Sequence, residues 1–90
     1  LRDLIQRRKT LTEQLATLLP GLEKGRADPA SVVKCRERLQ RLTTDAERTR
    51  KELARQLTKR CCREEVEAYL DDRFLIFDRL GAHARKLLGL

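Results

Sequence analysis

The feature that most constrains the fold of this 90-residue chain is a long stretch without glycine or proline. It runs from Ala30 to Leu80, and apolar residues recur within it every three or four positions. That spacing places them on one face of an α-helix. Aromatic residues make up only 3% of the chain and charged residues 39%, which is typical of amphipathic helices rather than of sheets. The chain is therefore predicted to be all-α.

A first helix is predicted over residues 2–19. Its apolar stripe is formed by Leu1, Leu4, Leu11, Leu15, Leu18 and Leu22. Arg8 is the one residue that interrupts the stripe. Pro20 lacks a backbone donor and Gly21 favours a positive φ, so we expect the helix to stop near Leu19.

A second helix is predicted over residues 29–58. Its start is the sharpest boundary in the sequence, because a capping carboxylate at Asp28 precedes Pro29, whose missing N–H costs nothing at the first helical position. One heptad phase then holds along the segment, with Thr49 as a polar exception. The residues in this phase are Val32, Cys35, Leu39, Leu42, Ala46 and Leu53.

The apolar stripe changes phase after Leu57. Continuing the earlier heptad would place Arg60, Arg63 and Glu67 on the apolar face, whereas the next apolar residues are out of step with it. Glutamates in the first turn of a new segment and cations in its last turn also suit the dipole of a separate helix. We therefore predict a turn near residues 59–63 and a third helix over residues 63–88. The alternative is one long helix over residues 29–88 that dimerises as a two-helix coiled coil.

Three amphipathic helices with short connections most simply form an antiparallel three-helix bundle. At 90 residues the chain fits one domain, so residues 1–90 are expected to be a single helical-bundle domain. Because the sequence begins with Leu1 rather than Met, we expect this domain to be a fragment of a larger protein.

Candidates for catalysis and for metal binding are few. His83 is the only histidine and Ser31 the only serine, and the four glycines are scattered, so no nucleophile motif or phosphate-binding loop is visible. The adjacent pair Cys61 and Cys62 lacks the spacing that zinc sites use. We therefore predict no enzyme activity, no catalytic residues, no metal and no cofactor.

The three cysteines and the hydropathy pattern bear on localisation. An odd cysteine number and an adjacent pair suit reduced thiols better than disulfides. The longest run of large apolar residues, Phe74 to Phe77, is far shorter than the roughly 20 residues that span a bilayer. We expect a cytoplasmic or nuclear protein.

An apolar excess in the third predicted helix is one candidate binding surface. Leu70, Phe74 and Phe77 share a stripe, whereas Leu75 and Ile76 point elsewhere, so the helix is apolar over more of its circumference than a three-helix core needs. The alternative is a helix buried on two sides by its neighbours. The predicted partner-binding residues are Tyr69, Phe74, Leu75, Ile76 and Phe77.

The second candidate surface is a basic face on the second predicted helix. The chain carries a net charge of +7, and most of the excess lies in this helix. Its face can contact an acidic protein, although a solvated face with intrahelical ion pairs is the simplest interpretation. The helix has no aromatic residues for stacking on nucleic-acid bases. The residues of the basic face are Lys34, Arg38, Arg41, Arg48, Lys51, Arg55 and Lys59.

These two surfaces predict a non-enzymatic protein–protein interaction or scaffolding domain, such as an adaptor. Its expected partner is another protein that offers an acidic surface or an amphipathic helix. One alternative is a helical oligomerisation module, in which a second copy pairs through the apolar stripes as in a coiled coil. The other alternative is electrostatic binding of nucleic acid or an anionic membrane to the basic face.

Overall fold

Helices make up almost all of the chain in the computed structural model, which describes residues 1–24 and 29–90. Four helices follow one another: α1 (Arg2–Lys24), α2 (Pro29–Leu57), α3 (Arg63–Arg73) and α4 (Leu75–Leu88). Within the described ranges the chain has no strand. The predicted all-α class is confirmed. The predicted cap at Asp28 lies outside the described residues.

The end of α1 differs from the prediction. The helix does not stop near Leu19 but continues through Pro20 to Lys24. A proline inside a helix removes one hydrogen bond and crowds the preceding turn. On the far side of Pro20, however, Leu22 is buried in the core, and its burial holds the last turn of the helix against the other elements. Tertiary packing therefore overrides the local stop signal.

The connection between α2 and α3 agrees with the predicted turn. Helix α2 ends at Leu57, whose carbonyl accepts hydrogen bonds from the backbone N–H groups of both Arg60 and Cys61. Cys62 then has an extended backbone, with φ of −71° and ψ of 155°, and precedes α3. The alternative of one continuous helix over residues 29–88 is therefore wrong.

The third predicted helix, residues 63–88, is divided at Phe74. This residue has φ of −95° and ψ of 1° and separates α3 from α4, although hydrogen bonds to Leu70 and from Asp78 continue on either side. The physical reason is tertiary, since two neighbouring helices act on this point. The guanidinium of Arg50 in α2 lies over the Phe74 ring, and Arg8 in α1 donates a hydrogen bond to the carbonyl of Arg73 at the end of α3.

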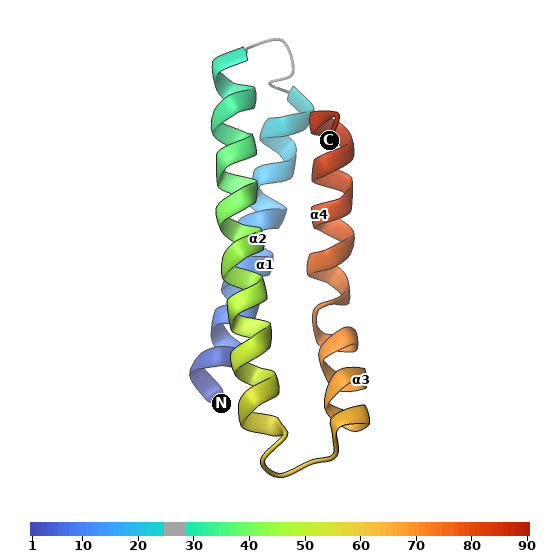
Figure 1. Cartoon of the computed structure of the whole chain (residues 1–90). Coiled ribbons are helices and arrows are strands. Elements are labelled where there is room, and N and C mark those ends of the chain that lie inside the picture. Colours follow the sequence, from blue (N-terminus) through green and yellow to red (C-terminus); the bar gives the residue numbers. More distant parts are fainter. Residues whose placement is uncertain (25–28) are drawn as a thin grey trace.

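The helices lie lengthwise beside one another in a molecule that measures 49 × 20 × 15 Å (Figure 1). Helix α2 runs antiparallel to α1, and α3 followed by α4 returns in the direction of α1. Helix α1 packs against α2 and α4, and α2 packs against all three other helices. The Cα atoms of α1 and α3 stay more than 8 Å apart throughout the described chain.

Two ends can therefore be distinguished. The α3 end contains Leu1, the link of residues 58–62 and α3, and the α4 end contains the end of α1, the start of α2 and the end of α4 (Figure 1).

The core runs along the inside of all four helices. Thr49, the polar exception in the α2 stripe, is buried with it, and its hydroxyl donates a hydrogen bond to the Asp45 carbonyl at 2.8 Å. The buried apolar residues are Leu11, Leu15, Leu22, Leu39, Leu42, Ala46, Leu53, Val66, Leu70, Phe74, Phe77 and Ala84.

Arg8 interrupts the leucine stripe of α1 for a structural reason. Its side chain is half-buried, and its guanidinium lies 3.0 Å from the carbonyl oxygen of Arg73. The last carbonyls of a helix lack partners further along the same helix, and the negative end of the helix dipole favours a cation there. Arg8 therefore joins α1 to the end of α3.

Candidate functional site

The predicted apolar binding residues fall into two groups. Phe74 and Phe77 are only 2% and 5% exposed and belong to the core, so neither is a surface on which a partner can dock. They lie on the stripe that faces α1 and α2, where the packing of three helices covers them. Tyr69, Leu75 and Ile76 are 36%, 42% and 62% exposed.

A groove on the α3 end brings apolar side chains from three helices and the link together, and Tyr69 is one of them. It has a volume of about 420 Å³. We call it the α1–α3 groove. Its lining residues are Leu1, Ile5, Leu53, Leu57, Cys61, Glu65, Val66 and Tyr69.

The separation of α1 from α3 creates this groove. Leu1, which precedes α1, and Ile5 of α1 form one wall, and Val66 and Tyr69 of α3 take part in the other. Between them lie leucines of α2, of which Leu53 is fully buried and Leu57 half-buried. No Cα atoms of α1 and α3 come within 8 Å of each other, so the groove is open on one side. Leu1, Ile5, Leu57 and Tyr69 are partly exposed there, whereas Leu53 and Val66 are covered.

Most of the groove was not predicted from the sequence. Only Tyr69 was among the predicted binding residues. A signal is visible in retrospect, because Ile5 and Tyr69 each stand beside an apolar stripe rather than on it. Such residues widen the apolar part of a helix toward one flank.

A basic cleft borders the groove and shares Leu1 with it. It is lined by Leu1, Arg55, Gln56, Lys59 and Arg60 and has a volume of about 410 Å³. Three of its five lining residues are cations and none is acidic.

One cation of the cleft is held by a carboxylate of its own helix. The Nε of Arg55 donates to Glu52 at 3.0 Å, and the terminal guanidinium nitrogen pairs with the other carboxylate oxygen. Hydrogen bonds from Arg55, and then from Gln56, lower the pKa of Glu52 from its ordinary value of 4.5 to about 2. The same pairing raises the pKa of Arg55. Both groups are therefore charged at neutral pH.

The predicted basic face of α2 lies at the surface. All of its seven residues, Lys34, Arg38, Arg41, Arg48, Lys51, Arg55 and Lys59, have exposed side chains. Arg50, which is not part of this face, is half-buried and pairs with Asp71 of α3 and Asp78 of α4. The face therefore extends along α2 as far as Arg55 and continues with Lys59 in the link after α2, and these last two members line the basic cleft.

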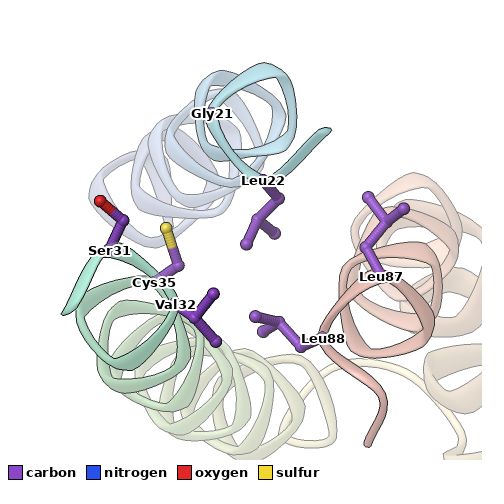
Figure 2. A pocket seen from close by; sticks show the side chains of 7 residues that line it. All are labelled: Gly21, Leu22, Ser31, Val32, Cys35, Leu87 and Leu88. Atoms are coloured by element: carbon purple, nitrogen blue, oxygen red, sulfur yellow. The ribbon is translucent and has the colours of Figure 1, made fainter. Parts of the chain in front are cut away.

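The α4 end has a smaller hollow of about 200 Å³ (Figure 2). Leu22 of α1, Val32 of α2 and Leu88 of α4 point toward one another across it. Cys35, predicted to be core, is half-buried and also lines this hollow. Its full lining is Gly21, Leu22, Ser31, Val32, Cys35, Leu87 and Leu88.

The other polar candidates do not converge. Cys61 and Cys62 are exposed free thiols in the link, and His83 lies at the surface of α4 with its Nε2 3.7 Å from a carboxylate oxygen of Glu23. Among residues 1–24 and 29–90, no cluster of three or more histidine, cysteine or acidic side chains is arranged to hold a metal ion. None of the helices in that same part of the chain is long and apolar enough to cross a bilayer.

Comparisons of the chain with protein-family models, with curated proteins and with solved structures find no match. The groove and the basic cleft are therefore the features of the chain that bear on its function.

Proposed function

We propose that this chain is a protein-interaction module that binds an amphipathic helix of another protein in the α1–α3 groove. In this proposal α1, α2 and the consecutive pair α3–α4 act as the three rods of an antiparallel bundle. The bound helix takes a fourth position at the α3 end, beside α1 and α3 and over α2. The observation that carries the proposal is that Ile5, Leu57 and Tyr69 line one groove and are partly exposed, where no Cα atoms of α1 and α3 come within 8 Å of each other.

A helix suits this groove better than an extended segment. An extended peptide gains much of its affinity by pairing with the edge of a sheet, and the described chain offers no strand. A helix instead presents apolar residues at intervals of three and four, which can contact both walls and the floor together. The groove residues that such a helix can contact are Leu1, Leu57 and Tyr69.

Tyr69 is the residue expected to contribute most to binding. Tyrosine is enriched among the residues that dominate interfaces, because it offers a large apolar surface with a polar end. Its ring already has the guanidinium of Arg73 over it, 5.2 Å from the ring centre, and the side chain is partly exposed. The ring is therefore partly ordered in the free chain, which lowers the entropic cost of binding a partner.

A second copy of the chain is a poorer occupant than another protein. Each copy carries a net charge of +7, so two copies repel each other. Light scattering is expected to give the mass of a monomer. A stable dimer that dissociates on substitution of Tyr69 would replace this proposal with oligomerisation.

The proposal can be tested with helical peptides in place of the natural partner. A displayed library of such peptides is selected for binding to the chain, and the selected peptides are then measured against Tyr69→Ala. We expect them to share an apolar stripe and to bind the variant about tenfold or more weakly. The matched control is Ile76→Ala, which removes an exposed apolar side chain that does not line the groove.

Two results would contradict the proposal. One is a library that yields no helical binder. The other is a set of binders whose affinity falls equally with Tyr69→Ala and with Ile76→Ala, since that would place binding away from the groove. Circular dichroism checks that each variant keeps the helical content of the parent chain.

A further inference from the structure

We infer that the bound helix is acidic along the flank that faces the basic cleft and lacks acidic residues where it faces Glu65. The inference rests on the proposed function, because it concerns the partner of the same groove. It follows from the distribution of charge around the groove. Glu65 is the only charged residue among the eight that line the groove, and the neighbouring cleft adds three cations beyond Leu1.

Two cations of the cleft have no ion pair in the described part of the chain. The charge of Arg55 is already balanced by Glu52. In the described part of the chain Lys59 and Arg60 have no carboxylate within 4 Å, and both side chains are exposed. A carboxylate on a bound helix can therefore pair with Lys59 or Arg60 without breaking an existing ion pair.

The α3 wall carries a negative charge near the link. Helix α3 begins at Arg63, which pairs with Glu67, and Glu64 and Glu65 follow in its first turn. Of these residues, Glu65 lines the groove. An acidic residue of the partner facing this wall would meet a like charge, which is unfavourable. The basic cleft, which meets the groove at Leu1, and Glu65 on the α3 wall therefore differ in sign, so a helix with acidic residues on one flank is expected to bind in one of its two directions.

The expected preference is moderate because the charges are exposed. Solvent-exposed ion pairs contribute little individually, and salt screens them. A peptide with two glutamates on the cleft-facing flank is therefore expected to bind about tenfold more tightly than one with two lysines there, at about 0.05 M salt. The difference should shrink toward about threefold at about 0.5 M salt, where the screening length falls to a few ångströms.

The experiment compares two peptides that share the apolar stripe of one library binder and differ only at those two flank positions, glutamate in one and lysine in the other. Their affinities are measured by fluorescence anisotropy for the parent chain and for the double variant Lys59→Glu with Arg60→Glu. We expect the preference to reverse in the double variant. The control is Lys34→Glu with Arg38→Glu, an equal change of charge on the basic face at the α4 end, which should leave the preference in its original direction.

Alkylation of the link thiols reports where the peptide sits. Cys61 lines the groove and Cys62 does not, and both are exposed. Iodoacetamide should therefore modify Cys61 more slowly when the peptide is bound, with Cys62 affected less. Because Cys61 and Cys62 are adjacent, they fall in one peptide of a digest. Mass spectrometry therefore assigns the modification by fragmenting that peptide between the two residues.

The outcomes separate the two proposals. If neither peptide binds, or if neither peptide protects Cys61 from alkylation, the proposed function fails. If both bind and protect Cys61 equally well and the charge reversal changes nothing, the groove is confirmed and the acidic partner is excluded. A third result would also overturn the inference. In it, duplex DNA or anionic vesicles displace the glutamate peptide, and their binding is lost in the double variant Lys59→Glu with Arg60→Glu. The cleft would then bind another polyanion.

Discussion

The two ends of the molecule use similar apolar side chains and arrange them differently. At the α4 end, α1, α2 and α4 all approach one another, and Leu22, Val32 and Leu88 point into a hollow of about 200 Å³. At the α3 end, α1 and α3 stay apart, and the groove between them has about twice that volume. The contrast lies in which helices meet rather than in how apolar they are.

This difference shows that burial in a small helical chain depends on every side of a helix being covered. Leucines of α2 occur at both ends on the same stripe. Where three helices meet, such a stripe is covered. Where one neighbour is absent, Leu57 remains partly exposed, although Leu53 on the stripe is buried. A binding surface can arise in this way without any unusual residue.

The largest effect is expected at the junction between the two ends. Phe74 is buried between α1, α2 and the end of α3, so Phe74→Ala should lower the free energy of unfolding by about 3–5 kcal/mol. Phe74→Leu keeps much of the volume and should cost about half as much. Ile76→Ala, two residues away and exposed, should change stability by less than about 0.5 kcal/mol. Urea denaturation measures all three, and a similar loss for Ile76→Ala would show that the exposed face is covered.

A matched pair of leucines compares the two ends directly. Leu22→Ala removes a buried side chain at the α4 end and should cost about 2–3 kcal/mol. Leu57→Ala removes a half-buried side chain from the groove and should cost about 1 kcal/mol, because less apolar surface returns to water. Thermal or urea unfolding gives both values. Equal losses would mean that the α3 end is packed as closely as the α4 end.

Arg8 tests how the two halves are joined. Arg8→Met keeps the apolar stem but removes the hydrogen bond to the Arg73 carbonyl, and should cost about 1 kcal/mol. Arg7→Met is the neighbouring control. It removes a more exposed pair with Asp45 at 3.4 Å and should cost about half as much or less. If the two variants are equally stable, the bond to α3 contributes no more than an ordinary surface contact.

The smallest effect concerns Glu52 at the edge of the basic cleft. Its pKa of about 2 lies below the ordinary 4.5, so the ionised carboxylate is favoured by folding. The resulting stabilisation is complete above about pH 4.5 and is lost as the pH falls toward 2. A carboxyl-carbon NMR titration should give this low value. Arg55→Gln should raise the pKa of Glu52 toward 4.5, and an unchanged pKa would exclude Arg55 as the main cause.

Local sequence signals predicted much of the fold. The start of α2 at Pro29 and its end near Leu57 followed from a proline at the first helical position and from a change of apolar phase. The two errors, at Pro20 and at Phe74, have one origin. In both places contacts with other helices decide the backbone, and no residue near them in the sequence reveals those contacts.

The site was predicted less completely than the fold. Of the five predicted binding residues, Tyr69, Leu75 and Ile76 are exposed, whereas Phe74 and Phe77 are buried in the core. Helical periodicity shows which residues share a face, but not which neighbour covers that face. The groove depends on the distance between α1 and α3, which are far apart in the chain, so it lay beyond what periodicity can predict.

The division at Phe74 also has a consequence for how the molecule moves. It leaves α3 with 11 residues, a length at which an isolated helix is only marginally stable in water. Helix α3 has close backbone contacts with α2 and α4, whereas its link to α1 is the hydrogen bond from Arg8 to the Arg73 carbonyl. Its amide hydrogens are therefore expected to exchange with solvent through local opening, faster than those in the middle of α2. A helix bound in the groove would pack against the side of α3 that faces α1. Binding is therefore expected to slow the hydrogen exchange of the α3 amides.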